Sequence, residues 1–155
     1  SVNVRAKVCG YYVNSLLAAR EARRHGHEEA ILLDHHGYVA EATGRNLFMV
    51  KRGKIYTPPT GNILPGITRD SLIQLAPDLG LRMIEKNIKP AELEQADEIF
   101  LSGTATEITA VTRLGRKVIN RRRPGPLTTR LQAYYRQIAQ GDIQRYIKWL
   151  TYVKI

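Results

Sequence analysis

NLFMVKRGKIYTP, residues 46–58, sets the architecture that the rest of the chain must fit. Two apolar runs, 46–50 and 54–58, flank a short basic turn, and this pattern predicts two antiparallel strands joined as a hairpin. The stretch 97–111, DEIFLSGTATEITAV, predicts a second pair of strands around a turn of small residues. The stretch 30–42, AILLDHHGYVAEA, predicts a third pair. The sheet is therefore expected to be mainly antiparallel or mixed.

Helical patterns lie between and beside these strands. Leu16, Leu17 and several alanines recur at helical spacing in residues 12–24, and Gly26 follows as a C-terminal cap. Thr68 is expected to be the N-cap of the next helix, whose last turn Pro77 kinks or shortens.

Further along the chain the sequence predicts one more strand and two more helices. They are a strand over 81–88, a short helix over 90–96 and a helical tail over 127–149 that is interrupted near Gly141. Helices and strands are mixed without a regular βαβ period, so the predicted fold class is α+β.

Composition limits the class of protein. A chain of 155 residues with 43% hydrophobic residues is the size of one globular domain. No apolar run approaches the roughly 20 residues of a membrane helix, and the start lacks a signal-peptide pattern, so we expect a cytoplasmic protein without a membrane partner. The single cysteine, Cys9, excludes an internal disulfide framework and is expected to be buried. Because the first residue is Ser1, the chain is expected to be part of a longer polypeptide.

The charge is strongly basic, with 24 Lys and Arg against 14 Asp and Glu. The basic residues gather in 20–27, 51–54 and 116–126, which are a predicted helix end, a hairpin turn and a loop. No aromatic residues of the kind that stack on bases are interleaved with them, so we expect solvated surface and no nucleic-acid partner. The four histidines lie at a helix exit and a turn, and no metal site is expected: His25, His27, His35 and His36.

Three parts of the sequence offer groups suited to an anionic, ring-shaped ligand. Lys7 precedes Tyr12 by five positions, and Glu41 is the lone acid of YVAEATGRN. Gly66 leads into a predicted helix N-terminus, where free N–H groups and the helix dipole favour phosphate, and Thr104 adds a hydroxyl in a second turn. An amine, an acid and an anion cradle together favour pyridoxal phosphate. Each group also has a structural explanation: a solvated lysine, a tyrosine at the edge of the core, an acid on a strand surface.

The chain resembles the branched-chain amino-acid aminotransferases, which are fold-type IV enzymes that depend on pyridoxal phosphate. Five segments carry the resemblance in the family's order: AKVCGYYVNSLLAAREA (6–22), GYVAEATGRNLF (37–48), YTPPTGNILPGITRDS (56–71), ADEIFLSGTATEIT (96–109) and RPGPLTTRLQ (123–132). The resemblance implies that residues 1–155 are the C-terminal, larger, cofactor-binding domain, with a mixed or antiparallel sheet or a barrel-like core flanked by helices. It also implies that the family's smaller N-terminal domain is absent from this chain.

The resemblance assigns a catalytic role to Lys7 and contacts with the cofactor ring to Tyr12 and Glu41. Lys7 would form the Schiff base with pyridoxal phosphate and later move the proton between the substrate Cα and the cofactor. Tyr12 would donate a hydrogen bond to the ring hydroxyl of the cofactor. Glu41 would keep the ring nitrogen protonated, which makes the ring a better electron sink.

The same resemblance assigns the two anionic ends of the ligands. Ile67 and Thr68 would bind the cofactor phosphate through their amides, Thr68 also through its hydroxyl, and Thr104 would contribute from the other turn. The amides of Thr104 and Ala105 would receive the substrate carboxylate.

The implied reaction is reversible transfer of an amino group between an L-branched-chain amino acid and 2-oxoglutarate, in a homodimer or higher homo-oligomer. D-amino-acid or R-amine aminotransferases and aminodeoxychorismate lyase, which share the fold, stay open as alternatives. A different alternative is a catalytically inactive fragment kept for assembly or anion binding. The sequence departs from the family pattern at Tyr11, Pro77 and Ala110.

Overall fold

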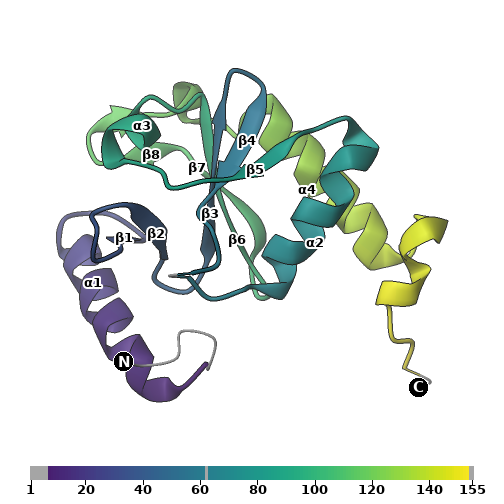
Figure 1. The fold of residues 1–155 in the computed structure, drawn as a ribbon, viewed down its shortest axis with the longest axis horizontal. Coiled ribbons are helices and arrows are strands. Elements are labelled where there is room, and N and C mark those ends of the chain that lie inside the picture. The colour runs from purple at the N-terminus through teal and green to yellow at the C-terminus, as the bar shows by residue number, and fades with distance from the viewer. Residues whose placement is uncertain (1–6, 62, 154–155) are drawn as a thin grey trace.

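The computed structural model describes residues 7–61 and 63–153. Figure 1 shows the arrangement of the helices and strands, which do not alternate regularly along the chain. The helices are α1 (Tyr12–Arg24), α2 (Ile67–Leu75), α3 (Pro90–Glu94) and α4 (Pro126–Gln140), with short 3-10 helices η1 (Cys9–Tyr11), η2 (Ala76–Leu79), η3 (Asn120–Arg122) and η4 (Gln144–Trp149). The strands are β1 (Ile31–Leu33), β2 (Val39–Ala42), β3 (Asn46–Lys51), β4 (Lys54–Thr57), β5 (Met83–Glu85), β6 (Glu98–Gly103), β7 (Glu107–Val111), β8 (Arg113–Leu114) and β9 (Lys117–Val118).

Strand β3 is the centre of a seven-stranded mixed sheet. It pairs antiparallel with β4 through the predicted hairpin, with β6 on its other edge, and with the end of β2. The parallel pair β4–β5 makes the sheet mixed, as predicted. The barrel-like alternative is wrong, because within residues 7–61 and 63–153 no ladder joins β7 to β1 or β5 and the sheet stays open.

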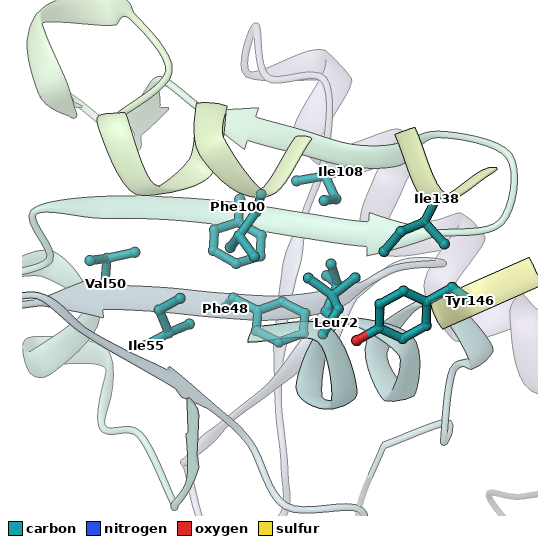
Figure 2. Packing of buried hydrophobic residues seen from close by; sticks show 10 residues of the cluster. Phe48, Val50, Ile55, Leu72, Phe100, Ile108, Ile138 and Tyr146 are labelled. Carbon is teal, nitrogen blue, oxygen red and sulfur yellow. The ribbon is translucent and has the colours of Figure 1, made fainter. Parts of the chain in front are cut away.

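The central strands are buried on both faces, which explains why they form continuous apolar runs in the sequence. Leu47 and Met49 point to one hydrophobic cluster, and Phe48 and Val50 to the other. Phe48 stacks on Phe100 of β6, with ring centroids 4.7 Å apart. Figure 2 shows this pair surrounded by aliphatic side chains from the neighbouring strands and helices.

Helices α2 and α4 cover one face of the sheet, whereas α1 lies apart from them beside β1 and β2 (Figure 1). Leu72 of α2 and Leu131 of α4 are fully buried against Phe48 and Phe100. The other face is covered by Leu93 of α3 and by loop residues. The α2 helix is therefore fixed firmly to the sheet, with its first residue at the edge of the core.

The two ends of α4 are held by polar contacts. At its N-terminus the buried carboxylate of Glu98 accepts hydrogen bonds from the Leu127 N–H at 3.0 Å, the Thr128 N–H at 2.8 Å and the Thr128 hydroxyl at 2.7 Å. At its C-terminus Gly141 adopts a left-handed conformation, which confirms the predicted interruption. The following η4 is tied to Asp78, which accepts a 2.6 Å hydrogen bond from the Tyr146 hydroxyl.

Three local predictions are corrected by the structure. Thr68 is not an N-cap, because Gly66 is the N-cap and α2 begins at Ile67, two residues earlier than predicted. The strand predicted over 81–88 is ordered as a strand only over Met83–Glu85. Cys9 is exposed, not buried. The effect of Pro77 is confirmed: α2 stops at Leu75 and continues only as a 3-10 turn.

The described helices are short or polar. Among residues 7–61 and 63–153, no helix has the length and apolar content to cross a membrane.

Candidate active site

A cavity of about 430 Å³ lies where β2, β3 and β6 meet the N-termini of α1 and α2. Six of the seven site residues predicted from the sequence line it: Lys7, Tyr12, Glu41, Ile67, Thr68 and Thr104. The seventh, Ala105, is exposed on the neighbouring turn and does not line the cavity. Segments that are up to 97 positions apart in the sequence (Lys7 to Thr104) are thus brought to one place.

Glu41 is the acidic group of the cavity. Its Oε2 accepts hydrogen bonds from the Asn46 side-chain amide at 3.1 Å and from the Leu64 N–H at 3.2 Å. Burial raises the pKa of Glu41 from 4.5 to about 7, although the hydrogen bond from Leu64 acts in the opposite direction. Near neutral pH this carboxyl group can therefore both hold and release a proton.

Asn46 fixes Glu41 in place and was missed by the sequence analysis. It lies directly opposite Glu41 in the β2–β3 ladder, and its amide also donates to the Leu64 carbonyl at 2.8 Å. Leu64 is part of the loop that leads to α2, so one side chain connects two strands to this loop. A polar residue at the start of an otherwise apolar strand, NLFMV, was the sequence signal for it.

The N-terminus of α2 faces the cavity without a capping side chain. Gly66 precedes the helix in an extended conformation, and no side chain hydrogen-bonds the first-turn amides as a cap. Ile67 is 81% exposed, whereas Thr68 is 4% exposed and lines the cavity from the first turn. Free amides at the positive end of a helix dipole suit an anion such as phosphate.

The turn after β6 forms another part of the cavity wall. Ser102 and Gly103 end the strand, and Thr104 is exposed at the turn, where the Thr106 N–H donates to the Gly103 carbonyl at 3.2 Å. Ser102 lines the cavity and is fully buried. In this turn only Thr104 and Ala105 were predicted from the sequence as site residues, so Ser102 is a second residue that was not predicted.

Lys7 and Tyr12 approach from the N-terminal side. Lys7 is exposed, two residues before η1, and Tyr12 is the half-buried first residue of α1. Because both line the cavity, the predicted amine and phenol lie on the wall formed by this segment. The side chain of Tyr11, where the sequence departs from the family pattern, lies outside what the structure describes.

Arg45 adds a positive charge to the rim of the cavity. Its Nε lies 3.8 Å from Oε2 of Glu29, and the Thr43 hydroxyl donates to the same carboxylate. Arg45 thus forms an ion pair with Glu29 beside the cavity. As for metals, the described residues contain no group of three or more His, Cys, Asp or Glu that would hold one.

Comparison with protein families gives a match over most of the chain. Residues 1–114 match the family described as amino-transferase class IV. A probable branched-chain-amino-acid aminotransferase of Aquifex aeolicus is 48% identical over 97% of this chain and 49% of its own length. The branched-chain-amino-acid aminotransferase of Escherichia coli K12 is 44% identical over 99% of this chain and 50% of its own length. The chain thus spans about half the length of the curated relatives it matches.

Solved structures resemble the fold closely. The branched-chain aminotransferase of the thermophilic archaeon Thermoproteus uzoniensis, solved with norvaline, has a TM-score of 0.92 and 45% identity over 97% of this chain and 50% of that one. The branched-chain amino acid aminotransferase of Thermobaculum terrenum, in its PLP form, has a TM-score of 0.96 and 40% identity over 99% of this chain and 51% of that one. The sequence resemblance to this family and the α+β fold are therefore confirmed.

Proposed function

The chain belongs to the class IV aminotransferase family, and we propose on this basis that it is the cofactor-binding part of an aminotransferase that uses pyridoxal phosphate and acts on branched-chain L-amino acids. One observation carries the proposal. A single cavity gathers an amine, a phenol, a half-buried acid and two anion-binding turns from separate parts of the chain. The names of the relatives support the substrate class.

The residues present fit pyridoxal phosphate. The cofactor carries a ring nitrogen, a ring hydroxyl, an aldehyde and a phosphate, each of which needs a different partner. Glu41 offers a carboxyl group at the cavity wall, and α2 offers uncapped amides at its N-terminus. Lys7 and Tyr12 supply an amine and a hydroxyl, so each cofactor group has a matching residue.

When bound, pyridoxal phosphate supplies an aldehyde carbon that condenses with amines and a ring that withdraws electrons from that carbon. The Lys7 amine would hold the cofactor at this carbon and would act as the general acid and base that moves the proton at the substrate Cα. Tyr12 would orient the ring through its hydroxyl. Glu41 would hold the proton at the ring nitrogen.

The electrostatics of the cavity support this division of work. A pKa of about 7 means that Glu41 shares a proton easily with a ring nitrogen, and the hydrogen bonds from Asn46 and Leu64 keep its carboxyl group in one orientation. At the other end, the first turn of α2 and Thr104 would hold the phosphate, and the amides of Thr104 and Ala105 would receive the substrate carboxylate. The ring would therefore be fixed between an acid and an anion site.

Assembly is a further part of the proposal. The apolar side chains of Val13, Leu16 and Leu17 on α1 are exposed, and so is Ile67 at the cavity. This supports the expectation that more protein covers this side, either the family's smaller N-terminal domain or a second subunit of a homo-oligomer. Light scattering of the full-length protein measures the oligomeric state. The cytoplasmic location stays a prediction.

The reaction is tested by measuring amino transfer to 2-oxoglutarate with the full-length protein. We expect turnover with L-leucine, L-isoleucine and L-valine and none with their D-enantiomers. Lys7→Ala should abolish turnover, whereas the control Lys54→Ala, at an exposed hairpin position, should leave it unchanged. Preference for D-amino acids, R-amines or aminodeoxychorismate would assign another enzyme of the same fold, and no turnover with any of them would favour an inactive domain.

A further inference from the structure

Ser102 has a buried hydroxyl that the fold leaves without a partner. The residue is 0% exposed, and its Oγ makes no hydrogen bond to any residue in the described part of the chain. Leaving a buried hydroxyl unpaired is costly, so native proteins seldom do it without a reason. Ser102 is also among the residues that line the cavity.

The sheet places Ser102 in a row with Glu41 and Asn46. Glu41 pairs with Asn46 across β2 and β3, and Asn46 pairs with Ser102 across β3 and β6. Directly opposite residues in antiparallel strands project to the same face, about 5 Å apart. All three side chains therefore project from the same face of the sheet in one row, and all three residues line the cavity.

The members of this row differ in what they bind. The Asn46 amide donates to Glu41 at 3.1 Å and to the Leu64 carbonyl at 2.8 Å, so its two N–H bonds are used within the protein. Ser102, at the end of the row, has no such partner among the described residues. Its hydrogen bond is left for the molecule that fills the cavity.

The position of Ser102 indicates which part of that molecule it meets. It stands two strands, or about 10 Å, from Glu41, which is assigned to the ring nitrogen. It is directly followed by the turn at Gly103 and Thr104, and α2 packs against its strand. The first turn of α2 and Thr104 of the turn after β6 were assigned to the phosphate. We propose that the Ser102 hydroxyl donates a hydrogen bond to the cofactor phosphate, an inference that rests on the proposed function.

Thr106 provides a matched control. Its Oγ1 is also buried and without a partner within the described residues, and it belongs to the same turn. Unlike Ser102, it does not line the cavity. If the Ser102 hydroxyl matters only because it is buried, the two residues should behave alike; if it binds the ligand, they should differ.

The test compares Ser102→Ala and Thr106→Val in the full-length protein. Equilibrium titration is done with pyridoxal phosphate, with pyridoxal, which lacks the phosphate, and with inorganic phosphate. We expect Ser102→Ala to lower the affinity for pyridoxal phosphate and for inorganic phosphate by about 10- to 100-fold, as for the loss of a hydrogen bond to a charged group. The affinity for pyridoxal should be unchanged. Thr106→Val should bind all three like the wild type. Without ligand, Ser102→Ala should melt at the same temperature as the wild type or higher, because it removes an unpaired buried group.

Two results would overturn the role of Ser102. One is unchanged affinity of Ser102→Ala for pyridoxal phosphate, and the other is an equal loss for pyridoxal and pyridoxal phosphate. If the wild type takes up no pyridoxal phosphate, the proposed function fails, and the phosphate titration still decides about Ser102. Equal phosphate binding by wild type and Ser102→Ala, or none by either, would then overturn the inference.

Discussion

Asn46 and Glu41 face each other across two antiparallel strands, and the Asn46 amide donates a 3.1 Å hydrogen bond to the Glu41 carboxyl group. The same amide donates to the Leu64 carbonyl at 2.8 Å, in the loop that leads to α2. One buried side chain therefore ties the acid of the cavity to the segment before α2.

Replacing Asn46 should damage both the fold and the site. Asn46→Ala leaves the Leu64 carbonyl without this donor and leaves Glu41 with only the hydrogen bond from the Leu64 N–H, and we expect a loss of about 1–3 kcal/mol in the free energy of unfolding. Cofactor affinity should fall as well, since Glu41 loses its orientation. Urea denaturation and cofactor titration measure the two effects. The control Asn87→Ala, at an exposed position, should change neither; equal stability of the two variants would refute the role of Asn46.

Gly66 is required because Asn46 lies against it. A Cβ at position 66 would lie 2.1 Å from Oδ1 of Asn46, which is well inside contact distance. Gly66→Ala should therefore push Asn46 or the start of α2 aside and weaken phosphate binding. Gly61→Ala is a suitable comparison, because a Cβ there meets no atom within 4 Å. Thermal melts and phosphate titration of both variants check this, and a harmless Gly66→Ala would contradict the close packing.

Glu41 should make the cofactor-free protein less stable as pH rises. Its pKa is about 7 in the folded chain against 4.5 as the ordinary value, so between these limits the folded state binds more protons than the unfolded state. The free energy of unfolding should therefore fall from about pH 4.5 to about pH 7. Glu41→Gln removes this contribution. The difference in stability between wild type and Glu41→Gln, followed by urea denaturation from about pH 5 to about pH 8, should decline with pH; a constant difference would mean that the pKa is not raised.

Glu98 should matter to the fold and not to the chemistry. Its buried carboxylate accepts three hydrogen bonds from Leu127 and Thr128 at the start of α4. Glu98→Ala should lower the free energy of unfolding by about 3 kcal/mol, because buried donors at a helix N-terminus lose their acceptor. Glu28→Ala, at an exposed position, should cost little. Denaturant titration distinguishes them, and similar midpoints would show that α4 does not need this cap.

Much of the fold was predictable from local patterns. The hairpin around 51–53 and the end of α2 near Pro77 follow from turn composition and from the missing N–H of proline. The open mixed sheet was harder, because the parallel pairing of β4 and β5 joins strands separated by α2. The start of α2 was misplaced by two residues, since Thr68 is a better capping residue than Gly66 until the packing of Asn46 is known.

The site was predictable only where single residues carry reactive groups. Lys7, Tyr12 and Glu41 were found because the amine, the phenol and the acid stand in segments with a recognisable family pattern. Asn46 and Ser102 were not, because their importance comes from strand register and burial, which no local pattern specifies. The partners of a side chain across a sheet become known only when the sheet is assembled.

The proposed function depends most on Lys7 as the amine that binds the cofactor. The most direct measurement is borohydride reduction of the full-length protein with pyridoxal phosphate, followed by peptide mapping of the trapped adduct. We predict a single phosphopyridoxyl group on Lys7, absent from Lys7→Ala and retained in Lys54→Ala. An adduct on another lysine, or none in the wild type, would contradict this assignment.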